Sequence, residues 1–317
     1  MTATDEPRSW PGRDALVLLG VLAALILGFG LATERFFTAM TLRTIANQVP
    51  ELVIAAVGLT FVLVIGGIDL SVGSVMALAS AALGLGLVKL GLGLGPASVL
   101  ALAVGLACGA LNGLLTVGLR LPSFIVTLGT LEMARGLTYL ATRSQTVYVG
   151  EAVERLAEPA LLGLSAPFLA ALGLVAAGQF ALSRTVFGRY ATAIGTNEEA
   201  VRLAGVDPAP IQIAVFALGG ALAGLAGIFF TARLGTADPN AGIGFELQAI
   251  AAVVVGGTSL LGGRASVVGS LLGVLIIAVL GSGLAQAGAQ EPTKRLVTGA
   301  VIVAAVVADR LRRRREW

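Results

Sequence analysis

The sequence predicts an all-α fold: a polytopic bundle of about ten transmembrane helices arranged in two loosely repeated halves. Of its 317 residues, 56% are hydrophobic and only 12% are charged, whereas a soluble domain carries about 25% charged residues. The 43 glycines favour helices that pack closely in lipid, where small side chains let backbones approach. We therefore expect one transmembrane domain over residues 1–317, embedded in a lipid membrane.

The individual spans follow from the apolar runs, because each crossing needs about 20 mostly apolar residues and Gly, Pro and charged clusters separate the runs. Glycine and threonine interrupt the chain at 256–258, so a nine-helix arrangement, which would reverse the C-terminal end, stays open. The spans expected are 15–32, 51–65, 70–88, 97–119, 123–142, 160–183, 211–232, 247–261, 267–284 and 296–309.

The positive charges predict the sidedness of the bundle. If both termini are cytoplasmic, more of the Lys and Arg residues lie on the inner side than on the outer side, and an even number of spans agrees with this. The basic tail at 310–317 is expected to be a stop-transfer signal and a contact for lipid headgroups. We interpret the apolar run that starts at Ala15 as an uncleaved first helix rather than a signal peptide.

The composition also excludes several classes of function. The chain has no histidine and one cysteine, Cys108, which removes the commonest metal ligands and most acid–base catalysts. We expect no catalytic residue, no metal site and no cofactor. The net charge of only +3 does not suit a nucleic-acid partner. The sequence lacks a phosphate-binding P-loop, so any ATP-driven step needs another chain.

A glycine pair followed by a carboxylate marks the junction of the second and third spans. Asp69 between two apolar runs is costly in hydrocarbon. It is interpreted first as a cap of the third span, and alternatively as part of a broken helix that lines a solute path; the two roles are compatible. The segment 254–260 resembles 64–70 and suggests the repeat. Candidate residues of the path are Gly66, Gly67, Asp69, Ser71, Gly256, Gly257 and Thr258.

The segment 184–209 is the longest predicted cytoplasmic connection and carries its own helix signals. Thr196 and Glu199 match a capping box, and Gly205 is a natural stop. These signals predict a short helix over 197–204. An ordered loop of this length is either an ordinary connector or a docking surface, and we favour docking. The candidate docking residues are Gly188, Arg189, Tyr190, Gly195, Asn197, Glu198, Glu199, Arg202 and Gly205.

Two further patterns lie inside the spans. Glu132 and Arg135 are one turn apart and could pair in the bilayer, as a structural clasp or as part of the pathway. Glycines at four-residue spacing predict close helix contacts. They are Gly105, Gly109 and Gly113, Gly220 and Gly224, and Gly269 and Gly273.

Four motifs in order resemble those of a known family. They are GIDLSVGS at 67–74, PSFIVTLGT at 122–130, the loop at 188–205 and ELQAIAAVVVGGTSL at 246–260. The chain closely resembles the ribose-type permease subunit of bacterial ABC sugar importers, in the branched-chain amino-acid and sugar importer family. The resemblance covers about 36–309. It departs from the pattern in the outer loop between the fifth and sixth spans, which is short here, and this leaves the transported sugar open.

The resemblance implies an architecture and partners. Such a permease has about ten spans, pairs with a second permease chain as a homodimer, and docks a cytoplasmic ATPase through the helix at 197–204. It also implies an extracytoplasmic sugar-binding protein, which Glu151, Glu154 and Arg233 could meet. The expected location is the bacterial plasma membrane. The alternatives are a branched-chain amino-acid permease and a gradient-driven carrier, which would need an ion relay for which Glu132, Glu51 and Asp69 are the only candidates.

Overall fold

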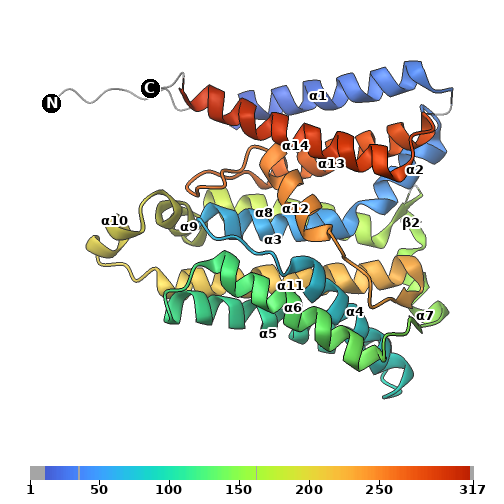
Figure 1. Cartoon of the computed structure of the whole chain (residues 1–317), viewed down its shortest axis with the longest axis horizontal. Coiled ribbons are helices and arrows are strands. Elements are labelled where there is room, and N and C mark those ends of the chain that lie inside the picture. The colour runs from blue at the N-terminus through green and yellow to red at the C-terminus, as the bar shows by residue number, and fades with distance from the viewer. Residues whose placement is uncertain (1–10, 35, 162, 315–317) are drawn as a thin grey trace.

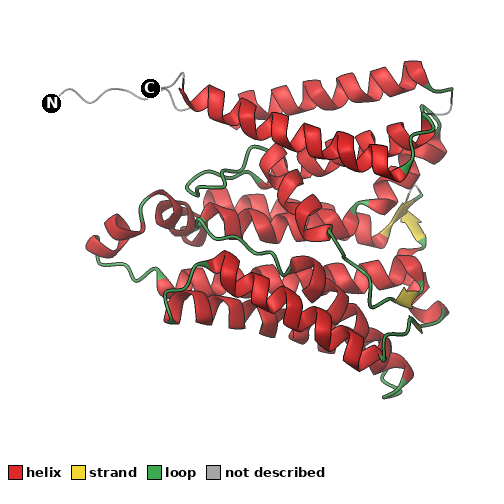
Figure 2. Cartoon of the chain, viewed as in Figure 1, coloured by secondary structure: helices red, strands yellow, loops and turns green. Residues whose placement is uncertain are grey.

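The computed structural model describes residues 11–34, 36–161 and 163–314, and helices make up most of the bundle (Figures 1 and 2). Short strands lie near one end of it (Figure 2). The helices are α1 (Pro11–Ala32), α2 (Ala39–Gln48), α3 (Pro50–Val64), α4 (Val72–Val88), α5 (Leu94–Gly118), α6 (Ser123–Thr142), α7 (Glu151–Glu154), η1 (Arg155–Ala157), α8 (Ala166–Arg184), α9 (Val186–Thr196), α10 (Glu198–Leu203), α11 (Ala209–Leu234), α12 (Phe245–Val255), α13 (Val267–Gln286) and α14 (Glu291–Arg314).

The all-α membrane fold is confirmed, and each predicted span corresponds to a helix. In the described part of the chain, five helices are long and apolar enough to cross a membrane, or six if α2 and α3, which meet at a bend of 45°, form one span. Helices α4 and α12 are apolar but shorter. Because α6 and α14 carry charges that lower their hydropathy, the number of ten crossings stays a prediction, as does the internal repeat.

Helix α3 is the centre of the bundle. All of its residues except Leu52 are buried, and a helix that is apolar on every side is stable only when neighbours surround it. Its side chains belong to the main core cluster together with residues of α4, α8, α11, α12 and α13. Helix α1 packs on the outside, where Phe29 joins a small cluster with Val279.

The predicted glycine contacts are confirmed between α5 and α11. A Cβ at Gly105 would overlap the carbonyl oxygen of Gly220, and one at Gly109 would lie 2.9 Å from the Gly220 Cα. The same holds between α12 and α13, where Gly269 meets Gly256 and Gly273 meets Ala252. These helices therefore touch through backbone, which only glycine permits at the contact.

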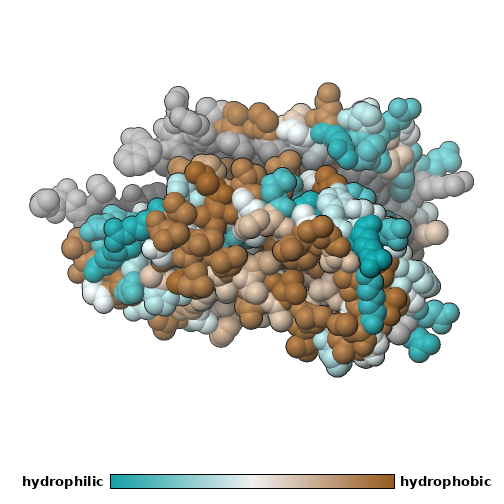
Figure 3. All heavy atoms as spheres, turned by 60° about the horizontal axis from the view of Figure 1, so that its bottom comes forward, coloured by the Kyte–Doolittle hydropathy of each residue, from teal (hydrophilic) through white to brown (hydrophobic). Residues whose placement is uncertain are grey.

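The surface formed by α5 and α6 suits lipid. Figure 3 shows this side of the molecule as hydrophobic across its middle and more hydrophilic toward its two ends. A band of this kind is what a hydrocarbon core of about 30 Å requires. The exposed apolar residues on the two helices include Leu106, Leu111, Leu114, Phe124, Ile125, Leu128, Met133, Leu137 and Leu140.

The bundle has two distinct ends, a loop end and a hairpin end. The loop end carries α9 and α10, and α1 begins and α14 ends near it (Figure 1). The opposite hairpin end carries α2, α7 and the strands (Figures 1 and 2). The strands there are β1 (Val147–Tyr148), which pairs with β4 (Thr236–Ala237), and β2 (Pro159–Leu161), which pairs with β3 (Leu164–Ser165), both antiparallel.

The hairpin end corrects the predicted spans. The sixth span was expected from residue 160, but Pro159–Leu161 and Leu164–Ser165 are paired β-strands and α8 begins at Ala166. Ser165 caps α8 by accepting a hydrogen bond from the Phe168 N–H (3.4 Å), and Gly163 turns the hairpin at φ +81°. Helix α2 was not predicted, because it is short and its mean hydropathy is low. Similarly, α12 ends at Val255, six residues before the predicted end of the eighth span.

Candidate functional site

The connection between α8 and α11 folds into two helices, α9 and α10, rather than the single short helix predicted. Thr185 caps α9 by accepting from the Gly188 N–H (3.3 Å). The predicted capping box is wrong: the Thr196 hydroxyl donates to the Thr192 carbonyl, and Asn197 caps α10 by accepting from the Ala200 N–H (3.0 Å). Asn197 is the N-cap residue because its backbone is extended, whereas Thr196 still belongs to the preceding helix.

Helix α10 ends as the sequence predicts. Gly205 adopts φ +82°, and the Val206 N–H donates to the Val201 carbonyl (3.2 Å), which is the hydrogen bond of a Schellman motif. Val201 is buried and Val206 partly buried. The short helix is therefore fixed at both ends and anchored to the core.

Glu198 forms an ion pair within α10 and a hydrogen bond with the long helix α11. Arg202 donates to Glu198 Oε1 (2.6 Å), and the Gln212 amide of α11 donates to Glu198 Oε2 (3.1 Å). The hydrogen bond with Glu198 raises the pKa of the exposed Arg202 guanidinium. Glu198, expected to face a partner, thus also holds α10 against α11, and Arg202 pairs with it on the same helix.

The outward side of this connection is exposed and chemically mixed. Arg189, Tyr190 and Glu199, all predicted docking residues, are exposed. Leu203 is 81% exposed on α10, an apolar group that the sequence analysis did not single out. Such a combination of charged, aromatic and apolar side chains is typical of protein interfaces.

Glycine residues bring α9 into backbone contact with the rest of the bundle. A Cβ at Gly188 would overlap the carbonyls of Ala181 and Leu182, and one at Gly195 would overlap the carbonyl of Val64. The same Cβ would lie 2.6 Å from the Gly263 nitrogen. No side chain separates α9 from these neighbouring backbone segments, so α9 cannot shift without moving them.

The two predicted helix breaks meet at this point. Helix α3 ends at Val64 and α12 at Val255, and the glycines that follow, Gly66 and Gly257, adopt φ +80° and +89°. The Gly263 N–H donates to the Val64 carbonyl (2.9 Å), which joins the loop after α12 to the end of α3. Residues 64–67, 195–196 and 256–264 are called the glycine junction below.

Beside the glycine junction lies a cavity of about 390 Å³. It brings together four of the predicted site residues, two from the helix break and two from α10. A movement of α10 would therefore change the shape of this cavity. The residues lining it include Gly66, Gly67, Ser123, Glu198, Arg202 and Gln212.

Asp69 and Ser71 lie in a buried polar network before α4. The Asp69 carboxylate accepts from the Ser71 N–H (2.8 Å) and hydroxyl (2.6 Å). Asn112 of α5 donates to the Ser71 hydroxyl oxygen (3.0 Å), and Thr130 of α6 donates to the Asn112 side chain (2.6 Å). The N-cap residue itself is Ser71, so Asp69 stabilises the turn into α4 from two residues earlier.

Helix α6 supplies the hydrogen bonds that an extended segment lacks. Ser123 accepts from the Ile68 N–H (2.9 Å), and Thr127 accepts from the Leu70 N–H (3.1 Å). A segment without regular structure inside a bundle needs such partners, because unpaired backbone groups are costly away from water. The sequence indicated the break but not these partners, although serine and threonine at four-residue spacing on α6 are a usable signal.

Among the described residues Arg135 forms no ion pair with Glu132, and the role expected of these two charges stays a prediction. Arg135 donates instead to the carbonyls of Pro239 (2.9 Å) and Ala241. These carbonyls belong to the turns before α12, which a guanidinium can reach with two donors. The clasp therefore joins α6 to residues 239–241 rather than to its own next turn.

Thr258 and Gly256 support the second break. The Thr258 hydroxyl accepts from the Ser266 N–H (3.4 Å), and Gly256 packs against the backbone of Gly269. These contacts fix the loop between α12 and α13. The role of either residue along a solute path stays a prediction.

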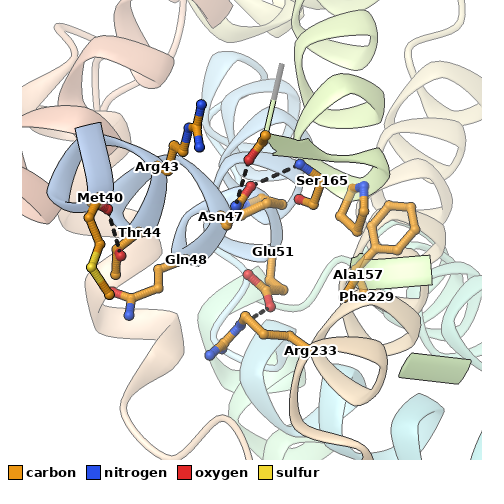
Figure 4. A pocket seen from close by; sticks show the side chains of 13 residues that line it. Met40, Arg43, Thr44, Asn47, Gln48, Glu51, Ala157, Ser165, Phe229 and Arg233 are labelled. Carbon is orange, nitrogen blue, oxygen red and sulfur yellow. Dashed lines mark hydrogen bonds and ion pairs between the residues drawn. The ribbon is translucent and has the colours of Figure 1, made fainter. Parts of the chain in front are cut away.

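A second cavity, of about 610 Å³, lies at the hairpin end (Figure 4). Glu51, on the first turn of α3, is 3% exposed and accepts from Arg233 Nε at the end of α11 (2.6 Å). The Arg233 guanidinium also lies 5.3 Å from the centre of the Phe230 ring. Arg233 was expected at the outer surface, but it pairs with the buried Glu51. The two residues are 182 positions apart in sequence, and no local pattern predicts such a pair.

Comparison with known proteins places the chain in a family. The model of the branched-chain amino acid transport system permease component matches residues 41–306. The chain belongs to this permease family. It is 39% identical over 305 residues to the ribose import permease protein RbsC of Escherichia coli (strain K12), covering 94% of this chain and 93% of that protein. No solved structure matches.

Other relatives of this permease differ in the solute that their names state. The fructose import permease protein FrcC of Rhizobium meliloti is 34% identical over 93% of this chain and 85% of its own length. The autoinducer 2 import system permease protein LsrC of Enterobacter sp. (strain 638) is 37% identical over 93% of this chain and 84% of its own length. The recognition of a ribose-type permease from the sequence is thus confirmed, and the chain is a multi-pass membrane protein.

Proposed function

We propose that this permease is the membrane-spanning subunit of a bacterial ABC importer for a monosaccharide and works by ATP-driven alternating access. The names of the relatives, which state ribose and fructose import, support the sugar class. Because the sequence has no P-loop, a separate cytoplasmic ATPase subunit would hydrolyse ATP. This chain would do no chemistry.

The glycine junction is the observation that carries the proposal. Gly195 lies in backbone contact with Val64 and Gly263, so a displacement of α9 and α10 acts on both helix breaks at once. Packed interiors transmit such displacements because they have few voids. A partner that pulls on this loop would move α3 and the loop after α12 together.

The partners follow from the placement of the exposed residues. The loop at 184–209 would dock the ATPase through Arg189, Tyr190, Glu199 and Leu203. The loop end, where α1 begins and α14 ends, would then be cytoplasmic, as would the basic tail at 310–317; residues 315–317 lie outside the described residues. A sugar-binding protein would meet the hairpin end near Glu151 and Glu154, and a second permease chain would complete a homodimer.

The solute path would pass the two helix breaks. Gly66, Gly67, Gly256 and Gly257 offer backbone groups there, and Asp69, Ser71 and Thr258 offer polar side chains. A mostly neutral path suits an uncharged polyol, because a charged solute is usually met by counter-charges.

The first test is mild extraction of the tagged chain from its native membrane, followed by mass spectrometry of the bound proteins. Recovery of an ATPase near equal stoichiometry supports the proposal. Recovery of the permease alone, with gradient-driven uptake in liposomes, would support a carrier instead. Uptake of leucine in preference to ribose by the purified complex would favour the branched-chain amino-acid permease.

A matched pair of variants tests the docking surface directly. Leu203→Asp places a charge on α10 and is expected to remove the ATPase from the extracted complex. Leu90→Asp changes an exposed leucine of similar accessibility, 66%, in the connection between α4 and α5, and should leave the ATPase bound. Equal recovery of the ATPase with both variants would exclude α10 as the docking site.

A further inference from the structure

The cavity at the hairpin end is lined by both polar and apolar side chains. The polar ones come mainly from α2, α3 and α11, and the apolar ones from α2, η1, α8 and α11. Ligand sites of about 300–1,000 Å³ commonly combine an apolar lining with a few polar groups that fix orientation. The polar lining includes Arg43, Asn47, Gln48, Glu51 and Arg233, and the apolar lining Met40, Ala157, Pro167 and Phe229.

Some of these polar groups serve the fold. Asn47 donates to the Gly163 carbonyl (3.3 Å) and accepts from the Ser165 N–H (2.9 Å), which holds the β2–β3 turn against α2. The Thr44 hydroxyl donates to the Met40 carbonyl of its own helix (2.8 Å). Neither group has its main donor or acceptor available for a bound molecule.

Other groups remain available to a ligand. In the part of the chain that the structure describes, the Gln48 side chain has no hydrogen-bond partner, and it lines the cavity with its amide near Met40 (Figure 4). Arg233 uses its Nε for Glu51, so its terminal nitrogens can still donate. Figure 4 shows the Arg43 guanidinium pointing away from Glu51 and Gln48, toward the rim.

These groups favour a neutral, hydroxyl-rich ligand. Glu51 and Arg233 neutralise each other, so this pair offers no net charge to a phosphate or to an ammonium group, and the other charged group in the lining, Arg43, points away from it. The Gln48 amide both donates and accepts, as sugar hydroxyls do, and the remaining Arg233 donors suit hydroxyl oxygens. The Phe229 ring, one turn before Arg233 on α11, also lines the cavity and suits the C–H face of a sugar ring.

We propose that this cavity is a binding site for a monosaccharide, held by Gln48 and the Glu51–Arg233 pair against Phe229. The site rests on the proposed sugar import for its biological meaning, and it deepens that function. It is separate from the glycine junction, because it is built at the opposite end of the bundle. A solute would bind it before or after passing the helix breaks.

Protection of a cysteine from labelling tests the site without relying on transport. In a Cys108→Ala background, Thr44→Cys places a thiol on the cavity wall and spares Gln48. Leu42→Cys places one on the same helix, outside the cavity lining. The purified complex in lipid nanodiscs is labelled with N-ethylmaleimide, with and without ribose, fructose, allose or leucine.

We expect at least one of the sugars to slow labelling of Cys at 44 at least about threefold, with no effect at 42. Adding Gln48→Leu should raise the sugar concentration for half-protection about tenfold, as expected for one lost hydrogen bond, and leave the labelling rate without sugar unchanged. Protection by leucine alone would overturn the monosaccharide assignment.

The site and the proposed function fail in different ways. If the complex imports a sugar that gives no protection at 44, the site is wrong and the function stands. If the complex imports none of the sugars, the function is wrong, and protection on the same sample decides the site separately.

Discussion

The two ends of the bundle are held together by different kinds of contact, backbone at one end and long side chains at the other. At the loop end, α9 meets α3 and the loop after α12 through glycine backbone, with Gly195 against Val64 and Gly263. At the hairpin end, long side chains such as Gln48 and Arg233 surround a cavity of about 610 Å³. Backbone contact leaves no freedom to adjust, whereas side chains can rearrange around a solute. The loop end is therefore suited to transmitting a displacement, and the hairpin end to accommodating a ligand.

Between the two ends, α6 contacts two segments without regular structure, each through different chemistry. Hydroxyl groups of Ser123 and Thr127 bond the segment before α4, whereas the guanidinium of Arg135 bonds the segment before α12. Both arrangements satisfy backbone groups that no regular structure pairs. The broken helices therefore depend on one neighbouring helix, and a tilt of α6 would affect both.

The largest expected effect comes from adding one methyl group at the loop end. Gly195→Ala places a Cβ into the Val64 carbonyl, which cannot move aside as a flexible side chain could. We expect sugar uptake by the complex in membrane vesicles to fall at least about tenfold, with normal amounts in the membrane, because overpacking shifts backbone.

Gly173→Ala on α8 is the matched control. A Cβ there meets no atom within 4 Å, so uptake should stay within about twofold of the parent. Equal uptake by the two variants would remove backbone contact as the basis of coupling.

The next effect concerns stability at the hairpin end. Arg233→Met leaves Glu51 buried without its partner, and breaking a buried pair from one side is costly. Since Arg233 is about one-third exposed, we expect a loss of only about 2 kcal/mol. The midpoint of thermal unfolding of the extracted protein measures it.

The double variant Glu51→Gln with Arg233→Met provides the control for this pair. Because it removes both charges, it should recover most of the lost stability. A double variant less stable than Arg233→Met alone would show that Glu51 stabilises the end independently of Arg233.

The sequence predicts the loop end better than the hairpin end, for a physical reason. Glycine pairs, caps and apolar runs are local signals, and they predicted the helix breaks and the end of α10 at Gly205. The hairpin end depends on contacts such as those of Asn47 with Gly163 and Ser165. Asn47 is over 110 residues away from both of them in sequence. No local pattern contains that information.

The charged residues inside the spans show the same limit. Spacing alone pairs Glu132 with Arg135, because they are one turn apart on a helix. The carbonyls of Pro239 and Ala241 accept hydrogen bonds from the arginine instead. The sequence alone does not show that the turns before α12 lie beside α6. A charge in a span thus indicates a buried partner without identifying it.

A moderate effect is expected at Asp69. Asp69→Asn keeps the Oδ1 acceptor for the Ser71 N–H, so uptake should fall no more than about threefold. Asp69→Leu removes the acceptor and leaves a buried donor unpaired, so uptake should fall at least about tenfold. Uptake normalised to the amount in the membrane distinguishes them. Complete loss with Asn at normal amounts would favour a role that needs the charge.

The smallest effect is expected at the surface of the loop end. Glu198→Gln keeps an acceptor for the Gln212 amide and loses only an exposed ion pair with Arg202, which contributes little in water. We expect sugar uptake within about twofold of the parent. Glu198→Lys instead places a second cation beside Arg202 and removes the acceptor, so it should lower uptake several-fold. If Glu198→Gln alone abolished uptake while the ATPase stayed bound, the ion pair would carry the coupling and the backbone contact at Gly195 would not suffice.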